Sequence, residues 1–146
     1  MKKIGVFFAA TLVAFLLGSY AFAIEWVPAN SLVVTWSPVT NFENGDPIPA
    51  ADSVEYAVYI VDAASSDKSI PCELLGVTSD TLYTITLVAE GKYLVGLKTI
   101  RKCANGVDVS ESVIGWSDDP LIVSEGKTFG LSYFFIPAMV QGLQIK

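Results

Sequence analysis

Histidine is absent from the 146 residues of this chain. It is the side chain most often used for proton transfer near neutral pH and the commonest metal ligand. Its absence excludes any catalytic triad or dyad that depends on histidine. The sequence also contains no nucleophile–base pair, metal-ligand constellation or phosphate-binding loop of a recognised pattern, so we expect no catalytic residues and no cofactor.

Basic residues are few as well. Two of the nine, Lys2 and Lys3, stand at the N-terminus, and the rest of the chain carries seven basic against 15 acidic residues, a net charge of −8. Affinity for nucleic acid and for anionic lipid comes mainly from clustered Lys and Arg. We therefore expect no nucleic-acid partner, and contact with a membrane only during export.

Long apolar runs are limited to residues 4–17, a stretch of 14 residues that is short for a helix crossing ~30 Å of hydrocarbon. Lys2 and Lys3 precede this run, and the small-residue pattern Ala21-Phe22-Ala23 follows it. These features are typical of a secretory signal peptide. We expect residues 1–23 to be removed and the mature chain to be secreted or periplasmic, in a bacterium. An uncleaved membrane anchor is the alternative.

After residue 23 the chain consists of short segments rich in Val, Ile, Thr, Tyr and Trp, separated by Gly, Pro, Asn and Asp. Turn signals recur about every ten residues, which favours an all-β fold, a seven-stranded antiparallel β-sandwich. The seven expected strands are residues 26–28, 32–36, 54–61, 72–77, 81–88, 92–102 and 109–116. Because side chains alternate along a strand, we expect these residues in the structural core: Trp36, Tyr56, Leu87, Tyr93, Val95 and Leu97.

Five elements in order resemble a fibronectin type III domain. Trp36 ends the second strand, Pro38 follows it, and Tyr56-x-Val58-x-Ile60 forms the third strand. Leu87 stands six residues before Tyr93, which is followed by Val95 and Leu97, with Gly91 in the expected turn. Thr99 departs from the family pattern, which usually has a small apolar residue there.

The resemblance implies an immunoglobulin-like fold over residues 24–120, with a C-terminal extension over residues 121–146 that has no counterpart in the family. Its sheets would have three and four strands, the larger containing the segments near Cys72, Val54, Lys92 and Val109. Tyr93 would form a tyrosine corner, with its ring in the core and its hydroxyl bonded to backbone.

The two cysteines, Cys72 and Cys103, favour a disulfide on the ground of export alone. In the implied fold, however, they lie at opposite ends of the strand that separates theirs, well beyond the ~7 Å between Cα atoms that a bridge allows. We therefore expect no bridge between them. Buried free thiols, or pairing with another chain, are the alternatives.

Acidic residues are densest in two loops, at Glu43, Asp46 and Asp52 and at Asp118 and Asp119. Oxygen-rich loops can bind calcium, but none of these residues follows a recognised spacing, and Asp is common in turns for its backbone geometry alone. Asp118 and Asp119 are adjacent and point to opposite faces of an extended chain, so they are poorly placed to flank one bond. We expect no metal site.

These observations favour an exported binding or scaffolding module without catalysis, acting on a protein partner or in an envelope assembly. A carbohydrate-binding module is an alternative that needs a planar row of exposed aromatic rings. A small hydrolase of unfamiliar type is another, which needs converging carboxylates.

The C-terminal extension is too apolar for a disordered linker. The outward face expected for residues 92–102 is also apolar apart from Lys98, and Gly96 indicates close approach by another segment. We expect residues 129–140 to pack over that face. The alternative is a flexible end that engages a partner in an assembly. The residues expected at the interaction surface are Tyr59, Leu94, Ile100, Phe129, Tyr133, Phe134 and Phe135.

Overall fold

The structure is a computed structural model that describes residues 23–65, 68, 72–142 and 144–145. The expected signal peptide falls on residues 1–22, outside this described part, apart from its last residue, Ala23. Within the described part, we find no helix with the length and apolar character needed to span a membrane.

The described residues form nine β-strands and one short 3₁₀ turn, η1 (Ser124–Gly126). The strands are β1 (Glu25–Pro28), β2 (Ser31–Thr35), β3 (Ser53–Asp62), β4 (Glu73–Thr78), β5 (Leu82–Thr86), β6 (Gly91–Lys102), β7 (Val109–Glu111), β8 (Gly115–Trp116) and β9 (Phe129–Tyr133). The β-rich composition predicted from the segment spacing is confirmed. Most expected strands appear within a few residues of their predicted bounds, but the strand expected over 109–116 is divided into β7 and β8.

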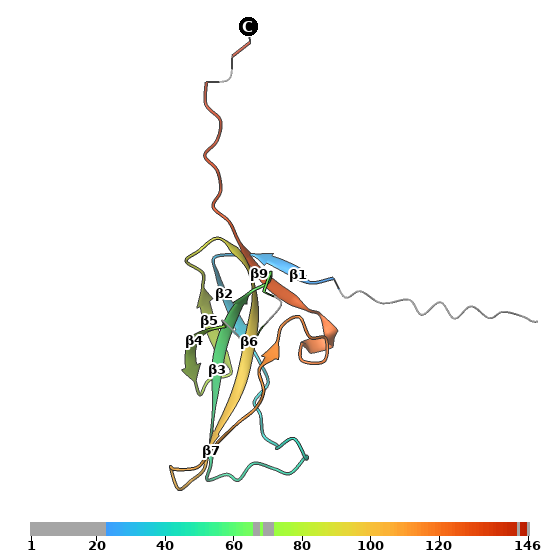
Figure 1. Ribbon diagram of the computed structural model, residues 1–146, viewed down its shortest axis with the longest axis vertical. Helices are drawn as coiled ribbons and strands as arrows, with labels where there is room; N and C mark the ends of the chain where they lie inside the picture. Colours follow the sequence, from blue (N-terminus) through green and yellow to red (C-terminus); the bar gives the residue numbers. More distant parts are fainter. Residues whose placement is uncertain (1–22, 66–67, 69–71, 143, 146) are drawn as a thin grey trace, which may run out of the picture.

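Seven strands form one sheet with the order β1-β9-β6-β3-β4, in which β7 and β8 also pair with β6 (Figure 1). The other two, β2 and β5, pair antiparallel as a separate sheet. The expectation of a purely antiparallel fold is wrong, because β1 pairs with β9 in parallel. The expected division into three and four strands is also absent, although the segments near Cys72, Val54, Lys92 and Val109 do lie in the larger sheet.

The core lies between the two sheets. The smaller sheet contributes Val34 and Ile85, and the larger contributes Val58, Val95 and Leu131. Of the residues expected in the core, Tyr56, Leu87 and Val95 are buried, while Trp36, Tyr93 and Leu97 are partly buried and pack against the core. These residues lie toward the core as alternation predicts, but burial itself does not alternate along β3 and β6, because Ala57, Val61 and Leu94 on the opposite face are also buried.

Two tyrosines fix the chain at the ends of strands. The hydroxyl of Tyr93 donates to the carbonyl of Ala89 at 3.2 Å, which confirms the predicted bond from this side chain to nearby backbone. The hydroxyl of Tyr56 accepts a bond from the N–H of Val39 at 2.9 Å. Both rings thus remain in apolar surroundings while the hydroxyl at the tip of each has a partner.

The outward face of β3 and β6 is partly covered, but not by the C-terminal tail. At Gly96, an added Cβ would lie 2.7 Å from both Ile114 Cγ2 and Trp116 Cζ3, so side chains from the β8 segment lie across β6 at this point. The prediction that Gly96 marks a close approach is confirmed, and the approaching residues are Ile114 and Trp116. Leu94 is 3% exposed, so the expectation that it lies on the surface is wrong.

Residues 129–133 join the larger sheet as β9, beside β6, and do not lie over its outer face. Tyr133 pairs with Gly91, and Leu131 is buried in the core. Phe129 and Tyr133 are partly buried against that core, so the expectation that they present an interaction surface is corrected. Their alternation with Gly130 and Ser132 explains this, because it directs every second side chain inward.

Both cysteines are free in the structure. Cys72 lies next to Glu73, which pairs with Ile60 near one end of β3. Cys103 follows Lys102, which pairs with Ser53 at the other end of β3. The register therefore places them at opposite ends of the sheet, as the expected topology requires.

Candidate functional site

The space between the two sheets is closed on the side of β4 and β5 and open on the side of β2. On one side, β4 leads directly into β5, and the hydroxyl of Tyr83 on β5 donates to the carbonyl of Leu75 on β4 at 3.0 Å. The Tyr83 ring lies against Gly76, where an added Cβ would come 2.6 Å from the hydroxyl oxygen. A covalent connection and a side-chain bond therefore close this side.

The opposite side is open along β2. The carbonyl of Asn30 accepts from the N–H of Leu87, and the N–H of Trp36 donates to the carbonyl of Thr81, so even-numbered residues direct their backbone groups toward β5. Because this direction alternates along an antiparallel strand, the N–H and C=O groups of Val33 and Thr35 face away from β5. No described residue bonds to them there. An unpaired strand edge of this kind is a template for pairing with another extended segment.

A looped-out segment, residues 118–128, lies across from this edge and divides β8 from β9. Ser117 closes its base: its N–H donates to the Val95 carbonyl, its Oγ accepts from the Val95 N–H, and its carbonyl accepts from Phe129. The sheet pairing with β6 thus stops at Ser117 and resumes with β9, while the intervening residues project as a loop (Figure 1). Glu125 and Gly126, with φ of 56° and 68°, turn the chain back at the tip.

A groove of about 960 Å³ lies between β2, the inner face of β6 and this loop. Its apolar lining includes Val34, Trp36, Val95, Leu97, Ile122 and Phe129. Among the described residues that line it, the charged ones are Glu125 and Lys127, which pair with each other. The groove thus combines an uncharged interior with the unpaired backbone of Thr35 at its margin.

The acidic residues considered as metal ligands do not converge on this groove or on one another. Asp118 pairs with Lys68 at 2.7 Å, and the backbone N–H of Leu121 donates to Asp119 at 2.9 Å. No group of three or more potential metal ligands is present among the described residues. Their carboxylates thus stabilise loops in this structure.

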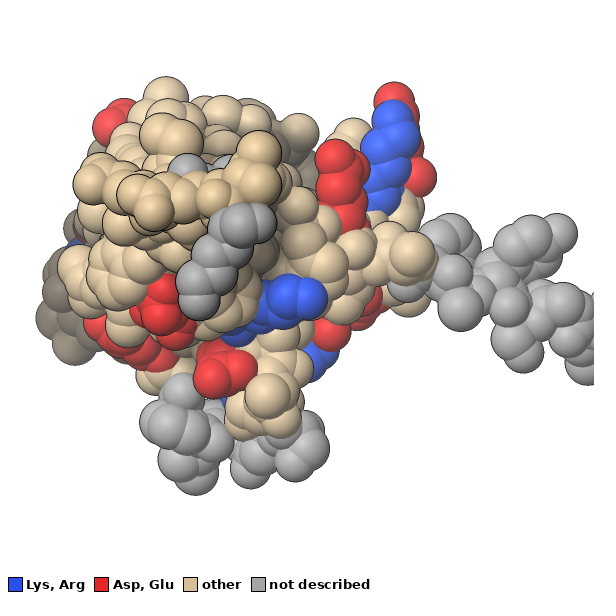
Figure 2. Space-filling view, turned by 90° about the horizontal axis from the view of Figure 1, so that it is seen from above, with Lys and Arg blue, Asp and Glu red and all other residues tan. Residues whose placement is uncertain are grey.

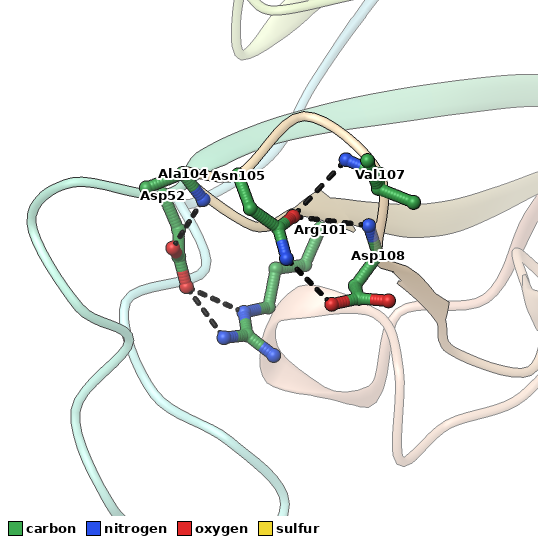
Figure 3. A network of polar contacts seen from close by, with 6 residues as sticks. All are labelled: Asp52, Arg101, Ala104, Asn105, Val107 and Asp108. Carbon is green, nitrogen blue, oxygen red and sulfur yellow. Dashed lines mark hydrogen bonds and ion pairs between the residues drawn. The ribbon is translucent and has the colours of Figure 1, made fainter.

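Asp52 belongs to a polar network at the end of the molecule opposite the tail (Figure 3). Its carboxylate is 6% exposed and accepts bonds from Arg101 Nε at 2.7 Å and from the N–H of Ala104 at 3.0 Å. Asn105 closes the adjacent hairpin through bonds with Val107 and Asp108. This network fixes the loop before β3 against the β6–β7 hairpin.

The remaining residues expected at an interaction surface are dispersed. Tyr59 and Ile100 are partly buried on the outer face, where the ammonium of Lys98 lies 5.9 Å from the centre of the Tyr59 ring. A hydrogen bond from Lys98 to Glu111 raises the pKa of Lys98 above its ordinary value. Phe134 and Phe135 are exposed and begin the tail. The structure does not bring these four residues into one surface.

Sequence reasoning missed the groove. The expected domain boundary at residue 120 separates most of the loop and all of β9 from the sheet that they complete. The signal was present in Phe129-x-Leu131-x-Tyr133, an alternating apolar pattern with the period of a strand.

Comparisons of the chain with protein-family models, with curated proteins and with solved structures found no match.

Proposed function

We propose that this chain is an exported binding module that takes an extended, uncharged segment of a protein partner along the open edge of β2. The observation that carries the proposal is the groove, in which unpaired backbone groups border a largely uncharged interior with apolar side chains. Main-chain hydrogen bonds to a free edge provide affinity, and pockets for alternate side chains provide specificity.

We further propose a fibronectin type III-like organisation for the module. Support comes from the inward side chains of Trp36, Tyr56 and Tyr93, from the Tyr93 hydroxyl bond, and from two sheets that enclose one core. Because β1 pairs with β9 and not with β2, no described strand pairs with the outer edge of β2, and this is the edge that borders the groove. Export rests on the leader sequence, residues 1–23.

Selection from a library of displayed random peptides against the purified exported chain tests this function. Thr35→Pro removes the backbone donor that faces the groove. It takes no donor from the β2–β5 pairing, because the Thr35 N–H faces away from β5, and proline is tolerated on an edge strand. Thr84→Pro is the matched control, since the Thr84 backbone faces away from β2 on the opposite edge of the same sheet.

We expect selected peptides to be uncharged and extended, to bind the Thr84→Pro variant normally and to lose binding to the Thr35→Pro variant. Peptides that bind both variants equally, or a library that yields no binders, would contradict the proposed function.

A further inference from the structure

The tail, which we define as residues 134–146, carries the apolar side chains that a groove of this kind accepts. No charged residue occurs between Phe134 and Ile145. Met139 and Val140 are 87% and 82% exposed, and every described residue from Ile136 onward is exposed. Exposed apolar residues that are contiguous in this way mark an interaction site.

Among the described residues of the tail, the contacts to its own domain lie at its start. The ring of Phe135 contacts Tyr133 edge-on at 5.4 Å, and the N–H of Phe135 donates to the carboxylate of Glu90. Beyond Phe135, the described residues make no hydrogen bond to the domain. The segment 138–142 (Ala-Met-Val-Gln-Gly) follows Pro137 and contains no further proline, so each of its residues has an N–H available for strand pairing.

The direction of the tail indicates a second molecule. It leaves from the end of the sheet where Tyr133 pairs with Gly91, and it runs away from the body of the domain (Figure 1). The groove lies away from this end of the sheet, beside residues 95–97 of β6. To enter its own groove the tail would have to reverse direction, whereas the groove of another copy imposes no such turn.

Charge restricts the surfaces through which two copies can make contact. The chain without its leader has a net charge of −8, so two copies repel each other over most of their surfaces. Figure 2 looks along the tail onto the domain and shows a broad area without charged side chains, with acidic and basic groups gathered at its borders. An uncharged tail that enters an uncharged groove makes contact without bringing like charges together.

We propose that the tail of one copy pairs with β2 and fills the groove of a second copy, so that the chain assembles head to tail. This inference rests on the proposed function and names its partner. The two surfaces differ, so the contact is heterologous and leaves one free groove and one free tail at the ends of any open assembly.

Two variants of the full exported chain separate the two surfaces. Thr35→Pro blocks the groove and leaves the tail intact. The double variant M139D/V140D leaves the groove intact and places charges on the tail. Because adjacent residues of a strand point to opposite faces, one of the two charges faces the groove in either register. The control V88D/V107D introduces the same charges at side chains of similar exposure, 89% and 80%, outside the tail and the groove.

The assay is sedimentation velocity over a range of protein concentrations. We expect the wild type and V88D/V107D to form assemblies larger than a dimer. Each blocked variant alone should self-associate at least about tenfold more weakly. An equimolar mixture of the two blocked variants should form a dimer and nothing larger, because one supplies the tail and the other the groove.

A monomeric wild type at every concentration would overturn the proposal, as would a mixture that stays monomeric or a tail variant that assembles normally. Wild type that stays monomeric but sediments with phosphatidylcholine and phosphatidylglycerol vesicles would assign the tail to membranes and also overturn it. Groove-binding peptides obtained from the library with a monomeric wild type would preserve the proposed function and refute only this partner.

Discussion

The Asp52 network gives the sharpest test of how the loops are fixed. Asp52→Ala removes three bonds, two from the Arg101 guanidinium, at 2.7 and 2.6 Å, and one from the N–H of Ala104 at 3.0 Å. It also leaves Arg101, whose side chain is 24% exposed, without its carboxylate. Breaking a fully buried pair costs about 3–5 kcal/mol, and partial exposure of Arg101 places this loss near the lower limit, about 3 kcal/mol.

Urea unfolding followed by tryptophan fluorescence measures this loss. For a domain of this size the slope is about 1.5 kcal/mol per molar urea, so the midpoint should fall by about 2 M. Asp46→Ala is the control from the same loop, because Asp46 accepts an exposed side-chain bond from Asn44, and its loss should be within about 0.5 kcal/mol.

A double-mutant cycle with Arg101→Ala isolates the pair. The double variant should lose at least about 1 kcal/mol less than the sum of the two single losses, because neither charge then remains unpaired. A loss for Asp52→Ala no larger than that for Asp46→Ala, or strictly additive losses in the cycle, would refute the reasoning.

Three further outcomes follow from the fold and the leader. Trp36→Ala should cost about 3 kcal/mol in urea unfolding and Trp36→Phe distinctly less, because the smaller ring still contacts Tyr56; equal losses would contradict this packing. Gly96→Ala should cost about 1–3 kcal/mol, because its Cβ meets Trp116; an unchanged melting temperature would refute the close contact. Mass spectrometry of exported protein should find Ile24 at the N-terminus, and a full-length chain would favour an anchor instead.

The inward faces of the strands could be predicted because period-two alternation is a local property of the sequence. Tyr56, Val58 and Ile60 share one face of β3 for this reason, and Val95, which pairs with Ile60, lies on the same face of the neighbouring strand β6. The Gly96 contact was also predictable in kind, since glycine within a strand often marks close approach. Which segment approaches depends on tertiary pairing, and the sequence does not specify whether that segment is Trp116 or the tail.

Strand order was harder to predict from the sequence, because strands that pair can be far apart along the chain. The pairing of β1 with β9 joins residues 25–28 to residues 129–132, and no local turn signal in the sequence indicates that these two strands pair. The loop 118–128 hid the continuity of β8 and β9 along β6, because Asp-Asp-Pro is a strong local stop signal. The groove arises from these two features together, so it could not be predicted from local patterns.

Backbone hydrogen exchange at β2 tests the central claim most directly. Leu32 and Val34 direct their N–H groups toward β5 and should be protected at every protein concentration. Val33 and Thr35 face the open edge, so the account predicts fast exchange in dilute protein and protection at concentrations where the chain assembles. Fast exchange at Val33 and Thr35 in the assembled protein would contradict the claim that this edge receives an extended segment.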